Sequence, residues 1–467
     1  MNEQELQAKV AQAARELAVP GVAVGVYHQG AEHYACHGVT SVENPLPVDA
    51  GTLFQFGSTG KTYTATAIMR LVDRGEVDLA APVRRYVPGL TLSDEQTAAR
   101  VTVLQLLNHT AGWAGDLLDN TGTGDDALAR YVARMARLEQ VTPLGTTVSY
   151  NNASLSLAGR LIELVTGNTF EDAMKELLFE PLGLTQSFFF PSDVMTRRFV
   201  AGHNQQPDGT ITVARPWAMP RGSNPAGGIT SNAGDLIRWA RFHLGDGRAA
   251  DGTRVLPAEL LRSMQQPTAQ SPGNATGDAV GISWWLRDVG GVRVVGHGGN
   301  TLGQDSGFDM VPERDFAVIT LANCSPNGSQ FNEQIRRWAF DAYLGVTERD
   351  PELVTLSAAE LARYAGRYET LASTADITAA DGNLMVAIAI RPEVRAELTD
   401  DQDADPDLPP FSIGLLEGPG DRYIVTDGAA KGMKGYFARA GTGEITGIHL
   451  GGRLATRTGP VSPAPPA

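Results

Sequence analysis

A serine and a lysine stand three residues apart, at Ser58 and Lys61, where a helical pattern of apolar residues begins. Residues i and i+3 share one face of a helix, so both side chains can point at one spot. A serine hydroxyl becomes a good nucleophile when a base takes its proton, and a lysine whose pKa is lowered by burial can be that base. Taken alone, the pair is better explained by an N-capping serine beside a solvated lysine.

A second pair, Tyr150 and Asn152, lies on a loop that leads into another helical segment. A phenol beside an ammonium can be held as a phenolate, or it can pass a proton to a leaving group. An asparagine carboxamide can orient both a lysine and a substrate amide. The structural alternative makes Tyr150 a buried aromatic residue and Asn152 the helix N-cap. Because Ser149 and Asn151 also fit an S-x-N pattern, the register stays open.

The third element is His297, Gly298 and Gly299, at the end of the strand-like run VRVVGHGG. Small residues there allow a substrate backbone to lie along the strand edge, as an added strand does. A backbone N–H just beyond could pair with that of Ser58 to form an oxyanion hole. The alternative is a glycine-rich strand end that carries a surface histidine.

Together and in this order, the three elements resemble those of serine β-lactamases and penicillin-recognising enzymes. The likeness is to class C β-lactamases and to related esterases, D-aminopeptidases and D-Ala-D-Ala carboxypeptidases. The segments LLNHTAGW, EPLGLTQSFF, PAGGITSNAGDLIRWARF and GHGGNTLGQDSGF are similar to the same group, so the resemblance covers about residues 5–345. It implies that Ser58 is the acylated nucleophile, with Lys61 and Tyr150 as its general base pair.

The resemblance also implies the residues that hold the substrate. Asn152 would position the substrate and the lysine, while His297, Gly298 and Gly299 would match the family's K-T-G strand. The backbone N–H groups of Ser58 and Asn300 would form the oxyanion hole.

One departure from the family pattern concerns the strand motif, where His297 replaces a lysine. A lysine there is a fixed positive charge that holds a substrate carboxylate. Histidine, with an unperturbed pKa near about 6.5, is mostly neutral at about pH 7 and largely protonated at about pH 5.5. This gives less support to efficient β-lactam hydrolysis, and a histidine here resembles D-aminopeptidase-like and esterase-like members.

These residues predict a serine hydrolase that acts through an acyl-enzyme on a small amide, peptide or ester. The resemblance implies that the substrate is a peptide that contains D-amino acids. We expect hydrolysis without a metal or cofactor, because the histidines are scattered and no ligand cluster has metal-site spacing. Two alternatives stay open. One is a promiscuous esterase or weak β-lactamase of the same fold, and the other is a penicillin-binding sensor that is acylated without turnover.

The elements that must position these residues follow the order helix, strands, helical insertion, strands, helix. This order predicts an α+β domain at 1–350, with an antiparallel sheet built from both ends of the domain. Short alternating runs then predict a small all-β domain at 355–458, either a sandwich or a closed barrel. It resembles the lipocalin-like barrels appended to some related peptidases. We expect the proline-rich residues 459–467 to be disordered.

Composition limits the partners of the 467-residue chain. The formal net charge is −15 and 19% of residues are charged, a pattern without the basic footprint of a protein that binds nucleic acid or an anionic membrane. Acidic Glu3 and Glu5 open the sequence, and we find neither a secretion signal nor an apolar run that could span a bilayer. We therefore expect a cytoplasmic protein; the sequence does not indicate its oligomeric state.

Overall fold

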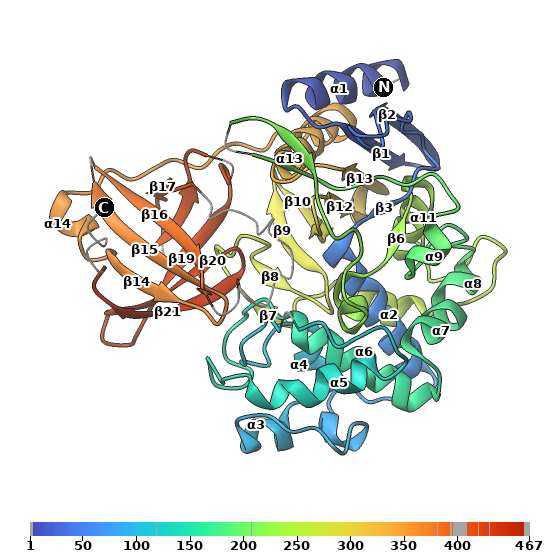
Figure 1. Cartoon of the computed structure of the whole chain (residues 1–467), viewed down its shortest axis with the longest axis horizontal. Helices are drawn as coiled ribbons and strands as arrows, with labels where there is room; N and C mark the ends of the chain where they lie inside the picture. Colours follow the sequence, from blue (N-terminus) through green and yellow to red (C-terminus); the bar gives the residue numbers. More distant parts are fainter. Residues whose placement is uncertain are drawn as a thin grey trace.

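The computed structural model describes residues 3–461 except 118, 207, 381, 393–394, 396–408, 419 and 429. An α+β domain precedes a closed, antiparallel eight-stranded barrel, as the sequence predicts, and the sandwich alternative is wrong. The barrel lies beside the end of the sheet formed by β7, β8 and β9 (Figure 1). The domain boundaries at 350 and 355 stay predictions.

The sheet of the α+β domain combines strands from both ends of the domain. β1 and β13 pair next to the β2 edge of the sheet, so the start and the end of the domain are joined by one ladder. In spatial order its strands are β2 (Ala31–Gly38), β1 (Gly21–His28), β13 (Phe316–Ala322), β12 (Asp305–Val311), β10 (Val292–Gly296), β9 (Trp285–Val289), β8 (Ala279–Val280) and β7 (Ala269–Gln270), with β11 (Gly299–Asn300) paired to β12.

Helices cover both faces of this sheet, so β1 and β13 are buried on both sides. Val22, Val24 and Val26 belong to a cluster with residues of the two terminal helices, whereas Ala23 and Tyr27 belong to the cluster on the opposite face. This alternation is the period of two that a strand imposes. The helices concerned are α1 (Glu3–Glu16) and α13 (Asn327–Ala339) on one face and α11 (Ala233–Leu244) on the other.

A helical region is inserted between the two sets of strands, and α2 (Gly60–Asp73) runs through it with nearly every side chain buried. One turn of 3-10 helix, η1 (Gly57–Thr59), leads into α2, and Gly75 follows its end with a φ of 72°. The other helices are α3 (Glu95–Arg100), α4 (Val103–Leu107), α5 (Ala127–Arg134), α6 (Asn152–Thr166), α7 (Phe170–Met174), α8 (Glu180–Leu182), α9 (Pro191–Val194), α10 (Asn224–Gly227) and α12 (Ala258–Met264). Within the described residues, no helix is both long and apolar enough to cross a membrane.

The barrel follows the short helix α14 (Ala358–Leu361) and is filled by its own side chains, among them Tyr368, Tyr423 and Phe437. Its last strand runs from Arg453 to Gly459. Gly459, the first residue of the expected disordered tail, ends this last strand, and 462–467 lie outside the described residues. The strands are β14 (Gly366–Glu369), β15 (Ser373–Ala380), β16 (Asn383–Ile390), β17 (Phe411–Leu415), β18 (Arg422–Val425), β19 (Lys434–Arg439), β20 (Ile445–Leu450) and β21 (Arg453–Gly459).

The contact between α6 and α10 gives a test of this packing. A Cβ on Gly159 of α6 would lie 2.2 Å from Cγ of Pro225. Replacing glycine by alanine in a helix gains up to about 1 kcal/mol, but overpacking costs about 1–3 kcal/mol. We therefore predict that Gly159→Ala lowers the free energy of unfolding, measured with urea. Gly234→Ala in α11, where an added Cβ would lie 3.4 Å from Asn232 Oδ1, should not destabilise the protein. Equal stability of both variants would contradict the packing described.

Candidate active site

Ser58 and Lys61 are brought together by the start of α2. Ser58 lies in η1 and is half-buried, while Lys61 points into the interior and is fully buried. Lys61 Nζ lies 2.9 Å from Ser58 Oγ and donates a hydrogen bond of 2.6 Å to the carbonyl oxygen of Ala226. The alternative of a solvated lysine is therefore wrong.

The surroundings of Lys61 favour its neutral form. Burial is the largest cause that lowers the pKa of this amine, and the positive charge of Arg453 lowers it further. The carboxylate of Asp116 acts in the opposite direction. A neutral amine next to a serine hydroxyl can accept the hydroxyl proton, which an ammonium cannot.

Tyr150 stands over Lys61, with its ring centre 4.8 Å from Nζ. Burial raises the pKa of the Tyr150 phenol, although a hydrogen bond with Ser58 and the charge of Arg453 oppose this. The phenol therefore stays protonated, which leaves proton relay, and not a standing phenolate, as the chemistry that Tyr150 can perform.

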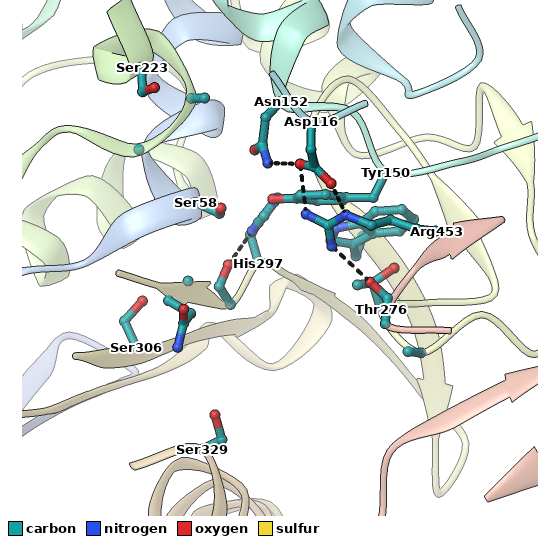
Figure 2. Close-up of a pocket in the computed structure, with 18 of the residues that line it drawn as sticks. Ser58, Asp116, Tyr150, Asn152, Ser223, Thr276, His297, Ser306, Ser329 and Arg453 are labelled. Carbon is teal, nitrogen blue, oxygen red and sulfur yellow. Dashed lines mark hydrogen bonds and ion pairs between the residues drawn. The ribbon is translucent and has the colours of Figure 1, made fainter. Parts of the chain in front are cut away.

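The loop that carries Tyr150 also settles the register of this motif. The N-cap of α6 is Asn151, whose side chain accepts a hydrogen bond of 2.8 Å from the backbone N–H of Ser154. The alternative that made Asn152 the N-cap is therefore wrong. Asn152 Nδ2 instead donates to Asp116 Oδ1 at 2.7 Å, and Asn152 faces the cavity beside Tyr150 (Figure 2). Ser149 faces the barrel and accepts a hydrogen bond from the backbone N–H of Leu454.

His297 lies between two strands, because β10 ends at Gly296 and β11 begins at Gly299. The imidazole is 3% exposed, and its Nδ1 lies 2.6 Å from the carbonyl oxygen of Gly298. The pKa of His297 is lowered to about 3, mainly by burial and secondarily by any positive charge on Lys61, while the hydrogen bond with the Gly298 carbonyl opposes this. The prediction of a surface histidine is therefore wrong. The prediction that it is largely protonated at about pH 5.5 is also wrong, because the ring is neutral at that pH.

The strand motif and the nucleophile meet through their backbones. An ideal Cβ on Gly299 would lie 2.0 Å from the carbonyl oxygen of Phe56 and 2.8 Å from the nitrogen of Ser58. A Cβ on Gly57 would lie 2.8 Å from the nitrogen of Asn300. Glycine at both places lets the two backbone N–H groups expected for an oxyanion hole come close together.

A cavity of about 820 Å³ joins these groups. The predicted residues that line it are Ser58, Tyr150, Asn152, His297, Gly298, Gly299 and Asn300, while Lys61 lies beneath Ser58. In the described part of the chain, no group of three or more His, Cys, Asp or Glu side chains is arranged to hold a metal ion.

Comparison with known proteins agrees with this geometry. The model of the Beta-lactamase family matches residues 6–342. The chain belongs to the beta-lactamase family. It is 37% identical over 360 residues to penicillin-binding protein 4 of Amycolatopsis lactamdurans, covering 75% of this chain and 93% of that one. This family comprises serine hydrolases, and the present member is an enzyme of that class.

Two further relatives of this beta-lactamase family member show how the similarity is distributed. The unguisins hydrolase ungD of Aspergillus violaceofuscus is 24% identical over 344 residues, which cover 68% of this chain and 61% of that protein. The crystal structure of SurE covers 98% of this chain and 99% of SurE, at 25% identity and a TM-score of 0.76. SurE with D-Leu gives a TM-score of 0.74 at 24% identity. The structural likeness therefore includes the barrel.

Two residues of the site were missed in the sequence. Asp116 and Arg453 form an ion pair beside Tyr150, and Arg453 belongs to the barrel strand β21 (Figure 2). The sequence contained one usable signal, because the pair Gly451-Gly452 between two alternating runs is typical of a hairpin. That signal gives the strand but not the side chain's destination.

The close contact at Gly299 yields a prediction. A methyl group there would collide with the backbone of Phe56 and push β11 away from Ser58, whereas a Cβ on Gly298 would have its nearest neighbour at 3.4 Å. Losing one oxyanion donor commonly costs about 100–1000-fold in kcat. We expect a loss of this size in Gly299→Ala and a much smaller one in Gly298→Ala, measured with a p-nitrophenyl ester. Equal losses would show that Gly299 does not set the position of the N–H groups.

Proposed function

We propose that this enzyme forms an acyl-enzyme at Ser58 and hydrolyses small peptides that contain D-amino acids. The observation that carries the proposal is the 2.9 Å contact between Ser58 Oγ and a fully buried Lys61 amine, at the floor of a cavity lined by Tyr150 and Asn300. Together these groups supply a nucleophile, its base, a proton relay and an oxyanion donor.

Acylation follows from these positions. The neutral Lys61 amine accepts the proton of Ser58 Oγ as this oxygen attacks the substrate carbonyl carbon. The backbone N–H groups of Ser58 and Asn300 stabilise the charge on the carbonyl oxygen. The Tyr150 phenol donates a proton to the leaving nitrogen or oxygen and regains one from the Lys61 ammonium. The acyl-enzyme thus forms with Lys61 neutral again.

Deacylation uses the same groups with water as the nucleophile. Lys61 accepts a proton from the water that attacks the ester carbon, and Ser58 Oγ leaves with a proton returned through Tyr150 or Lys61. A carboxylic acid is released and the free serine is restored. A sensor that is acylated without turnover would stop before this stage, so turnover distinguishes the two functions.

The choice of a peptide substrate rests on the polar groups of the cavity wall. Gly299 and Asn300 of β11 offer backbone groups for an extended substrate, and Asn152 offers a carboxamide. SurE, which shares the fold of this chain and was crystallised with D-Leu, supports a substrate with D-residues, and the unguisins hydrolase supports a hydrolytic reaction. Hydrolysis in the cytoplasm stays a prediction from the sequence.

An uncharged ester is the second candidate, favoured by the neutral His297. Burial keeps the pKa of this imidazole at about 3, so it supplies no fixed charge for a carboxylate where the family motif has lysine. A promiscuous esterase or weak β-lactamase has this profile. A screen of matched D-peptides, L-peptides, p-nitrophenyl esters and penicillins decides between the substrates by kcat/KM.

We predict that Ser58→Ala abolishes turnover of every substrate in this screen and leaves the fold intact. The variant lacks Ser58 Oγ, the hydroxyl that lies 2.9 Å from Lys61 Nζ. A fluorophosphonate should label Ser58 in the natural protein and no residue in the variant. Peptide mass spectrometry locates the label. Covalent mass at another residue would contradict the assignment.

We predict that Lys61→Ala and Tyr150→Phe each remove most activity and that the double variant is little worse than the worse single one. Groups that act in one proton-transfer unit give non-additive losses. The measurement is kcat/KM for the three proteins with one ester. Additive losses would place Lys61 and Tyr150 in separate steps, and full activity of Tyr150→Phe would exclude the phenol from proton transfer.

A further inference from the structure

We propose that Arg453 of the barrel is a positioning residue of the active site, which holds Asp116 against Asn152 and places a fixed positive charge near Lys61. The barrel then completes the catalytic site. This inference rests on the proposed function, because it assigns a part of the same reaction to the second domain.

The hairpin between β20 and β21 enters the site and is fixed there by its backbone. Gly451 and Gly452 form its turn with φ values of 56° and 82°, which glycine adopts without strain. The carbonyl oxygen of Gly452 accepts a hydrogen bond of 2.9 Å from the backbone N–H of Tyr150. On the other side of Arg453, the N–H of Leu454 donates to Ser149 Oγ at 3.2 Å. The loop that carries Tyr150 is thus clamped on both sides of Arg453.

The Arg453 side chain then reaches across to the first domain. Its Nη2 donates to Asp116 Oδ1 at 3.0 Å, its Nε donates to Asp116 Oδ2 at 2.5 Å, and its guanidinium carbon lies 5.0 Å from the centre of the Tyr150 ring. Asp116 Oδ1 also accepts the bond from Asn152 Nδ2. One carboxylate therefore joins the barrel to the carboxamide that faces the substrate cavity (Figure 2). Two parallel bonds give this pair a defined geometry.

The groups that surround Lys61 show why the charge of Arg453 matters. Tyr150, His297 and His109 also face this amine, but burial raises the pKa of the phenol and lowers the pKa of both imidazoles, so all three are neutral. Arg453 and Asp116 are then the charged groups that act on Lys61. Arg453 lowers the pKa of the lysine and Asp116 raises it.

A merely structural bridge makes a different prediction. If the ion pair only held the barrel against the first domain, removing either partner would loosen the same contact and change activity in the same way. If the pair acts on Lys61 by its charges, the two removals shift the pKa of Lys61 in opposite directions. The acid limb of kcat/KM reports this pKa, because the base must be deprotonated.

The test compares Arg453→Gln and Asp116→Asn in the full chain, with kcat and KM measured against pH on one uncharged ester. We expect Arg453→Gln to lower kcat by up to about 100-fold, because a misplacement of about 1 Å in a catalytic group can cost this much. Its acid limb should move to higher pH, while that of Asp116→Asn moves to lower pH. An unchanged kcat in Arg453→Gln, or shifts of both limbs in the same direction, would overturn the inference.

A matched control lies in the same barrel, where Arg367 and Asp376 make a similar two-point pair at 2.8 and 2.7 Å. Arg367→Gln should keep the natural kcat and pH profile. Arg453→Lys retains the charge without the two-point contact, so its acid limb should return towards that of the natural protein. If Arg453→Gln fails to fold, the kcat and acid limb of Arg453→Lys test the role of Arg453 in its place. Fluorophosphonate labelling of Ser58 in the natural protein separates the two claims: absent labelling refutes the proposed function, whereas normal labelling with unshifted limbs refutes only the role of Arg453.

Discussion

The Lys61 amine has lost its water, and the chemistry of the whole site depends on this burial. Because the folded protein lowers the pKa of Lys61, the native state binds fewer protons than the unfolded chain below about pH 10.4. The free energy of unfolding therefore falls as the pH drops from this value towards the folded-state pKa. The burial that lowers the stability also provides a neutral base next to a serine hydroxyl.

The surrounding elements are arranged so that the buried amine keeps its partners. Helix α2 carries Lys61 into the core of the helical region, and α10 supplies the carbonyl oxygen of Ala226. Small residues keep these elements in contact, since Gly159 allows α6 to touch Pro225 and Gly299 allows β11 to touch the turn before α2. Much of the glycine near the site therefore serves backbone contact and not flexibility.

The local parts of this site could be predicted from the sequence, and the parts that depend on distant contacts could not. The spacing of Ser58 and Lys61 on one helix gave their common direction, and strand and helix patterns gave the α+β domain and the all-β domain.

The role of Asn151 as N-cap was missed because two adjacent asparagines fit the same pattern. The neutral state of His297 depends on its burial beside Trp285 and Tyr150, which spacing does not reveal. Arg453 pairs with a carboxylate 337 positions away, and nothing local marks such a contact.

A direct titration of the Lys61 amine tests whether this group is the neutral base of the site. The chain contains few lysines, and those other than Lys61 are exposed or half-buried, so ¹³C-lysine labelling gives a spectrum in which Lys61 is assigned by its absence from Lys61→Arg. The lysines are Lys9, Lys61, Lys175, Lys431 and Lys434. We predict that Lys61 titrates well below the ordinary value of about 10.4. A Lys61 resonance that titrates at about 10.4, in the folded and active enzyme, would contradict it.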